Sequence, residues 1–251
     1  MPINYSRKLT GRVRTPNANR HLGLALTFVA GAINAGGFLA VAQYTSHMTG
    51  IVSSMADNLA LGSAGVALAG LFALLAFIVG ATCSAILVRY SRRRGLHSEY
   101  ALPLMLEACL LLCFGLLGAR LAVVGGLFVP VTVVLLSFIM GLQNAVISKL
   151  SNAEIRTTHI TGIVTDIGIE MGKLAYPDRG HKGPNALAPS NPQRLALLCM
   201  MLMFFFLGGL AGALGFKHVG FIATVPLALA LVFLASVPIA DDLHFFWRRK
   251  S

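Results

Sequence analysis

The sequence predicts an all-α membrane protein with six transmembrane helices, built as two inverted three-helix repeats that each carry a re-entrant or broken half-helix. Three observations lead to this fold class. The 251 residues are 56% hydrophobic and only 12% charged, whereas about 25% of the residues of a soluble domain are charged. The basic residues gather in a few short segments. One polar sequence motif, called the polar phrase below, occurs twice along the chain.

Six apolar segments are long enough to cross a hydrocarbon core of about 30 Å, which takes about 20 helical residues. The first of them is too long for the apolar core of a secretory signal, so no cleavable signal peptide is expected. We predict a single transmembrane domain over 22–240, between a basic tail at 1–21 and a second tail at 241–251. The six segments lie near residues 22–43, 64–88, 101–119, 122–147, 195–216 and 219–240.

The positive charges orient these predicted spans. With a cytoplasmic N-terminus and one crossing per span, every basic residue except Arg120 and Lys217 falls on the cytoplasmic side. The positive-inside rule predicts such a bias for short loops. Both tails and the loop at 176–194, which is rich in Pro and Gly, are then cytoplasmic. Because topology accounts for the net charge of +11, no nucleic-acid partner is expected.

The polar phrase occurs once in each half of the chain. In the first half, 31–35 (Gly-Ala-Ile-Asn-Ala) precedes 45–52 (Thr-Ser-His-Met-Thr-Gly-Ile-Val). In the second half, 141–145 (Gly-Leu-Gln-Asn-Ala) precedes 157–164 (Thr-Thr-His-Ile-Thr-Gly-Ile-Val). Two such matches at nearly the same separation indicate an internal duplication.

The number of crossings in each repeat decides whether the duplication is inverted. Repeat one covers 22–119 and repeat two covers 122–240, with three predicted crossings each. Because three is odd, the second repeat enters the membrane from the opposite side. Inverted repeats of this kind occur in many transporters and in several channels.

Two leftover segments, 48–62 and 160–175, begin inside the two copies of the phrase. They are apolar enough to prefer the membrane, but they are too short and too polar to cross it as full transmembrane helices. Counting both as crossings would move the arginine cluster at 89–94 to the outside, against the charge rule. We therefore expect re-entrant or broken half-helices. Irregular backbone at membrane depth must be buried in protein or line a water-filled cavity.

Thr49-Gly50 and Thr161-Gly162 look like the starts of these half-helices. A Thr hydroxyl can accept hydrogen bonds from the N–H groups of a first helical turn, and Gly allows close approach. Two helix N-termini offered from opposite faces would form a positive site for an anion or a polar group. Simple capping with tight packing is the alternative.

The ionisable side chains within the repeats are the next candidates. Ionisable groups are costly in a bilayer, so Asp57 and Asp166 either face a functional cavity or fasten helices together. His47 and His159 occupy equivalent places, where they could gate, relay protons or hydrogen-bond at the edge of a half-helix. No third ligand supports a metal. The predicted substrate-binding residues are Asn34, His47, Thr49, Gly50, Asp57, Asn144, His159, Thr161, Gly162 and Asp166.

Other polar or reactive residues leave their roles open. Glu107 stands alone in the third predicted span, where it can pair with the arginines at 92–94, snorkel or line a path. All four cysteines fall in apolar spans, so disulfides are not expected. Cys109 and Cys113 share one helical face, and packing between helices is favoured there over binding of a soft metal.

The sequence contains none of the catalytic signatures Gly-x-Ser-x-Gly, His-Glu-x-x-His, Cys-x-x-Cys or a phosphate-binding Gly-rich loop with its Lys. We therefore expect no enzyme and no cofactor. The leading function is a small-solute secondary transporter or permease, and the alternatives are a passive hourglass-type channel and a non-transporting scaffold. The expected partners are the lipid bilayer and a small solute, including an anionic one. A homo-oligomer is left open.

The repeat phrases resemble the YoaK-type family of bacterial inner-membrane proteins, a family of unknown function. The resemblance covers roughly 22–240, and it implies six spans and an inner-membrane location but no substrate. The chain departs from the family pattern at Asn34, where Asp is common, and at Ile51, where Asn is common. The matching segments are 31–35 and 48–50 (Met-Thr-Gly) in the first repeat, with 140–145 and the run 156–166 in the second.

Overall fold

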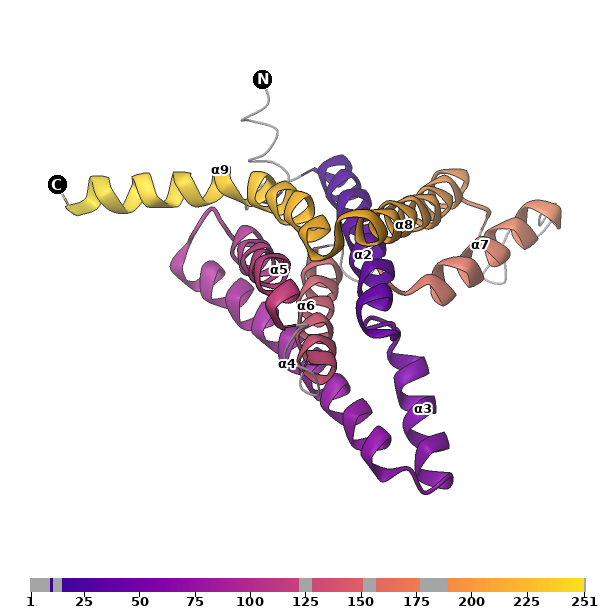
Figure 1. Cartoon of the computed structure of the whole chain (residues 1–251). Coiled ribbons are helices and arrows are strands. Elements are labelled where there is room, and N and C mark those ends of the chain that lie inside the picture. The colour runs from indigo at the N-terminus through magenta and orange to yellow at the C-terminus, as the bar shows by residue number, and fades with distance from the viewer. Residues whose placement is uncertain (1–9, 11–14, 122–127, 151–156, 177–188, 251) are drawn as a thin grey trace.

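The computed structural model describes residues 10, 15–121, 128–150, 157–176 and 189–250. These residues form helices and short connections, with no strand among them, so the predicted all-helical class is confirmed (Figure 1). In chain order the elements are α2 (Pro16–Val41), α3 (Met48–Ala60), α4 (Ala64–Arg94), α5 (Ala101–Leu121), α6 (Phe128–Leu150), α7 (Ile160–Ala175), α8 (Pro192–Val219), the 3-10 helix η2 (Gly220–Ala223) and α9 (Thr224–Lys250).

Four helical stretches are long and apolar enough to cross a membrane, namely Asn17–Val41, Ala64–Arg94, Val129–Lys149 and Pro192–Leu243. The last of them contains α8, η2 and α9, and α5 adds a shorter apolar helix, Ala101–Leu116. Large apolar side chains remain exposed along α4, α8 and α9. Apolar surface of this extent is unfavourable in water and is covered by lipid in a bilayer. The chain is therefore a membrane protein.

Local sequence sets several helix ends. The Thr15 side chain accepts a hydrogen bond from the first turn of α2, and Asn191 does the same for α8, as N-cap residues do. At the other ends, α2 stops at Ala42 and α4 stops at Gly95, both in the left-handed conformation. Left-handed residues commonly terminate helices, so α2 ends before the polar phrase and leaves a break ahead of α3.

The two halves of the chain pack through equivalent helices. Helices α2 to α5 form the first half, and α6 to α9 repeat their order in the second. The most extensive packing joins α2 to α8, α4 to α6, and α5 to α9. The first helix of each half therefore packs against the third helix of the other half. The short helices α3 and α7 pack mainly on the helix that follows them, α4 and α8 (Figure 1).

The crossing of α2 and α8 depends on glycines, which are Gly31 on α2 with Gly208 and Gly212 on α8. A Cβ atom added at Gly31 would clash with the carbonyl oxygen of Phe205, and one added at Gly208 would clash with that of Phe28. Both glycines end a Phe-x-x-Gly motif, which begins at Phe28 on α2 and at Phe205 on α8. Small residues let the backbones of membrane helices approach closely.

The crossing of α4 and α6 repeats this arrangement. Gly80 lies against the carbonyl oxygen of Phe138, and Gly141 lies against that of Phe77, so a Cβ atom at either glycine would clash with backbone. The same Phe-x-x-Gly motif begins at Phe77 and at Phe138. The two crossings are thus built in the same way from different pairs of helices.

Most predicted boundaries lie close to the observed ones. The leftover segments predicted at 48–62 and 160–175 form the short helices α3 and α7. Helix α9 extends to Lys250, through most of the predicted tail at 241–251. Residues 122–127 of the fourth predicted span, 177–188 of the predicted loop, and 1–9 and 11–14 of the N-terminal tail lie outside the described residues.

Candidate functional site at the starts of the two half-helices

A cavity of about 660 Å³ lies where α3 and α7 begin. Both halves of the chain line it with residues at equivalent positions of the repeat. These pairs are Asn34 and Asn144, Ser46 and Thr158, His47 and His159, Met48 and Ile160, Thr49 and Thr161, and Phe77 and Phe205, with Tyr44 and Ser148 completing the wall.

Two asparagines fix the chain just before each half-helix. The Oδ1 atom of Asn34, on α2, accepts a hydrogen bond of 2.8 Å from the Ser46 hydroxyl. The Oδ1 atom of Asn144, on α6, accepts one of 2.8 Å from the Thr158 hydroxyl. We call Asn34 and Asn144 the asparagine anchors. Each anchor holds the residue that comes immediately before the N-cap of a half-helix.

The half-helices begin at histidines rather than at threonines. His47 and His159 are the N-cap residues of α3 and α7, and neither makes a side-chain capping hydrogen bond. The expected Thr caps are therefore wrong, because Thr49 already lies inside the first turn. Intrahelical bonding starts with the Ile51 and Ile163 amides, each 3.1 Å from its histidine carbonyl. Of the amides ahead of them, that of Met48 donates to the Ser46 carbonyl at 3.2 Å, and the first-turn amides that follow it have no acceptor within their own helix.

Glycine in the first turn makes room for each histidine ring. A Cβ atom at Gly50 would collide with the His47 ring, and one at Gly162 would collide with the His159 ring. The two rings therefore fold back over the starts of their own helices. Both histidines are exposed to the cavity that they line.

Among the described residues, the cavity wall contains no Asp, Glu, Lys or Arg side chain. Its polar surface consists of hydroxyls, two amides, two imidazoles and the uncapped starts of two helices. A helix N-terminus carries a partial positive charge and offers free N–H groups, which suit an anion. Within the described residues, His, Cys, Asp and Glu form no group of three that could hold a metal ion.

Six of the ten predicted site residues line this cavity, and the remaining four do not. Gly50 and Gly162 lie beneath the histidine rings, as described above. Asp57 is exposed on α3, eight residues or about 12 Å beyond Thr49 along the helix. Asp166 follows Thr161 by five residues, which turns it about 140° around α7. The structure therefore does not bring the two aspartates to the cavity.

The acidic residues of α7 instead attach this helix to the start of α8. Asp166 forms an ion pair of 2.9 Å with Arg194. The Glu170 carboxylate, only 2% exposed, accepts hydrogen bonds of 2.8 Å from the Asn191 amide and from Lys173. The Asn191 amide and then Lys173 lower the pKa of Glu170, which lies outside the spanning stretches. These contacts set the position of α7.

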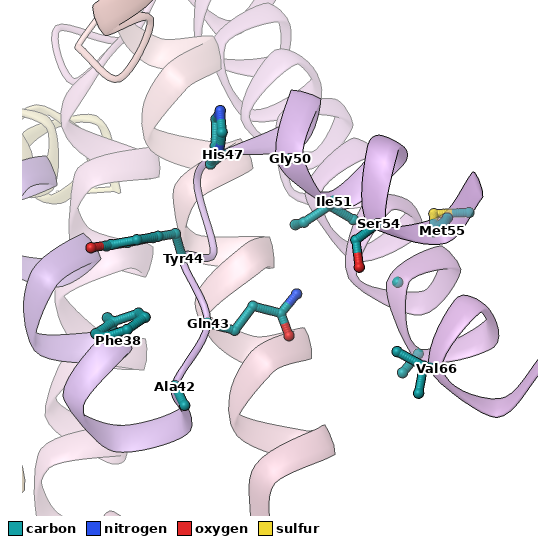
Figure 2. A pocket seen from close by; sticks show the side chains of 12 residues that line it. Phe38, Ala42, Gln43, Tyr44, His47, Gly50, Ile51, Ser54, Met55 and Val66 are labelled. Carbon is teal, nitrogen blue, oxygen red and sulfur yellow. The ribbon is translucent and has the colours of Figure 1, made fainter. Parts of the chain in front are cut away.

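A second cavity of about 290 Å³ lies between the end of α2, α3 and α4. Figure 2 shows its wall, with the Phe38 and Tyr44 rings on one side and Ser54 and Met55 of α3 on the other. The two rings stack with centroids 4.5 Å apart. Tyr44 and His47 line both cavities. They therefore form the boundary between the second cavity and the central one.

Sequence reasoning missed several lining residues. Ser46 and Thr158 carry a signal, because a hydroxyl precedes the histidine in both copies of the phrase. Phe77 and Phe205 also carry a signal, the Phe-x-x-Gly motif, which occurs on four helices. Tyr44 has no counterpart that the repeat would have indicated, since Arg156 takes the equivalent position.

The fold and the cavity define a helical membrane protein in which the short helices α3 and α7 begin at one cavity. The family described as protein of unknown function (DUF1275) matches residues 22–237, and the chain belongs to this family. No curated protein and no solved structure matches the chain. The family match is consistent with the YoaK-type resemblance, which stays a prediction, and it names no substrate.

Proposed function

We propose that this protein is a small-solute secondary transporter of the bacterial inner membrane, without enzymatic activity, and that its central site binds a small anion. One observation carries the proposal. Of the residues that the structure describes, two helix starts without a side-chain cap and no charged side chain line the cavity between the halves. Transporters use half-helix N-termini near the bilayer midplane in this way to bind anionic groups of their substrates.

The proposed topology has six spans, formed by α2, α4, α5, α6, α8 and α9, with both termini in the cytoplasm. The stretch Pro192–Leu243 contains 52 residues, which would make a straight helix of about 78 Å, more than twice the hydrocarbon thickness. The 3-10 helix η2 and Gly220, with its φ of 64°, interrupt this stretch. Two crossings fit it better than one.

The exchange of packing partners supports an inverted repeat. The first helix of each half packs against the third helix of the other half, and α5 packs against its own counterpart α9. A two-fold axis in the membrane plane would produce these pairings. Phe77 and Phe205 stand at the two crossings and also line the cavity. Rocking one repeat against the other about these crossings would expose the cavity alternately to each side.

A passive channel and a non-transporting scaffold are the competing functions. A transporter saturates with solute and shows counterflow, whereas a channel shows neither accumulation nor trans-stimulation. A scaffold would not depend on the hydroxyls of the cavity. Flux into proteoliposomes distinguishes a transporter from a channel. The threonine variants below test the scaffold.

Binding of a small anion should raise the melting temperature of the purified protein, because a ligand that binds only the folded state stabilises it, by about 2.7 kcal/mol at 100 times its Kd. The screen would contain chloride, phosphate, succinate and glutamate, with glucose and lysine as neutral and cationic comparisons. The stabilisation should disappear in the double variant Thr49→Val and Thr161→Val.

The matched control is Thr165→Val, because the Thr165 hydroxyl donates to the Thr161 carbonyl on the exposed face of α7, outside the cavity wall. This variant should keep the full anion-dependent shift. Stabilisation by lysine alone, no stabilisation by any anion, or an equal shift in the double variant would contradict the proposed site.

A further inference from the structure

One carboxyl group is buried in the helix bundle away from the cavity. Glu107, on α5, is 0% exposed and accepts a hydrogen bond of 2.9 Å from the side-chain amide of Gln143 on α6, which is also 0% exposed. The second carboxyl oxygen of Glu107, Oε2, and the amide oxygen of Gln143, Oε1, have no hydrogen-bond partner within the part of the chain that is described.

No charged group in the described part of the chain compensates this carboxyl. Helix α5 packs against α4, α6, α9 and η2. Arg92 on α4 bonds instead to Glu99 and Tyr100, just before the start of α5. None of the described titratable residues on the packed helices or on α5 itself makes an ion pair or a hydrogen bond with Glu107. They are Cys83, Arg89, Tyr90, Arg92, Arg93 and Arg94 on α4, Lys149 on α6, Asp241 and Asp242 on α9, and Cys109 and Cys113 on α5.

A bound proton satisfies this environment better than a negative charge does. An isolated carboxylate in an apolar interior is strongly unfavourable, and such a group takes up a proton instead. A protonated Oε2 becomes a donor, and the unpartnered oxygen of Gln143 is an acceptor of the type that such a donor needs. Protonation therefore removes the buried charge from the pair.

Gln143 connects this pair to the cavity through its neighbour in the chain. The next residue is Asn144, an asparagine anchor, which lines the cavity and holds the start of α7 through Thr158. In the first repeat the position equivalent to Gln143 is Ile33, which is buried and apolar. Gln143 therefore has no polar counterpart in the first half, and its bond to Glu107 joins the two halves.

We propose that Glu107 is the proton-binding site that couples transport to the proton gradient, with Gln143 as the positioning residue. This inference rests on the proposed transport function. An anion in the cavity repels a carboxylate at Glu107, which lies on α5 against the α6 residue next to Asn144, so anion and proton bind together. Such coupling is reciprocal, and it makes the protein a proton–anion symporter. In each cycle the Glu107 O–H bond releases H⁺ to water on one side, and the carboxylate regains H⁺ from water on the other.

Proteoliposomes test this coupling with radiolabelled phosphate, succinate and glutamate, each assayed separately. An acidic outside medium should drive accumulation of at least one of these anions by the unmodified protein, at least tenfold above vesicles without a pH gradient. Glu107→Gln should abolish this accumulation but keep exchange of the same anion at equal pH, because exchange needs no net proton movement. Glu99→Gln, a carboxyl change outside the cavity and the Glu107–Gln143 pair, should leave both activities unchanged.

The outcomes separate the two proposals. Accumulation by Glu107→Gln, or exchange by the unmodified protein without any accumulation driven by the pH gradient, would overturn the coupling and leave the transport function standing. If the unmodified protein exchanges none of the three anions, the proposed transport itself is contradicted, and the coupling falls with it.

A second measurement uses the unmodified protein, so it does not depend on whether a variant folds. The apolar reagent dicyclohexylcarbodiimide reacts with a protonated carboxyl, whose O–H adds across one C=N bond, and the adduct rearranges to a stable N-acylurea. Mass spectrometry of the labelled protein should find one reagent on Glu107 at acidic pH and progressively less as the pH rises. An unlabelled Glu107 at acidic pH, or labelling that ignores pH, would contradict a proton-binding role.

Discussion

Gly141→Ala should lower the free energy of unfolding by about 1–3 kcal/mol, which is the usual effect of overpacking. The added methyl group would meet the backbone carbonyl of Phe77, which cannot move aside as a flexible side chain can. Helices α4 and α6 would have to separate, and their shared surface would open along its length. Denaturation of the purified protein in detergent measures the loss.

Gly168→Ala is the matched control for this change. Nothing lies within 4 Å of a Cβ atom at Gly168, which is also helical. This variant should be neutral or more stable by up to about 1 kcal/mol, because alanine favours helix over glycine. Equal destabilisation by the two variants would show that helix propensity, rather than the close crossing, decides the outcome.

Asn34→Leu and Asn144→Leu should each weaken anion binding by about tenfold, which corresponds to about 1.4 kcal/mol. Each change removes an asparagine anchor and leaves a hydroxyl, Ser46 or Thr158, without its acceptor. A buried polar group that loses its partner costs about 1–3 kcal/mol. Because the anchors act on different half-helices, the double variant should lose about a hundredfold. Titrating the thermal shift with anion measures these affinities.

Asn58→Leu serves as the control for the anchors. Asn58 lies on α3, and its side chain donates to the Ser54 carbonyl within the same helix rather than between elements. Binding in this variant should equal that of the unmodified protein. If Asn58→Leu weakens binding as much as Asn144→Leu does, the effect belongs to helix stability and not to the anchors.

The sequence predicted the parts of this fold that depend on length and repetition. The apolar runs predicted the long helices. The repeated polar phrase predicted two short helices at the residues where α3 and α7 lie. It also selected Asn34, His47, Thr49 and their counterparts, which the structure places around one cavity. Their role in binding stays a prediction that the experiments above test.

The remaining features needed the packed structure. The rotation of α7 turns Asp166 away from the cavity and toward Arg194, and no pattern along the chain fixes that rotation relative to another helix. Glu107 and Gln143 are 36 residues apart and meet only because α5 packs on α6. The four Phe-x-x-Gly motifs were visible in the sequence. The sequence did not show which motif packs against which between the two halves.

The charge preference of the cavity tests the central claim most directly. Single cysteines at Thr49 and Thr161, in a chain whose four native cysteines are replaced, can be titrated with methanethiosulfonate reagents of opposite charge. If both helix starts face one anion site, the negatively charged sulfonatoethyl reagent should react faster than the positively charged trimethylammonium reagent at both positions, relative to a cysteine at Thr165. A faster reaction of the cationic reagent, or a preference at only one of the two positions, would contradict a shared anion site.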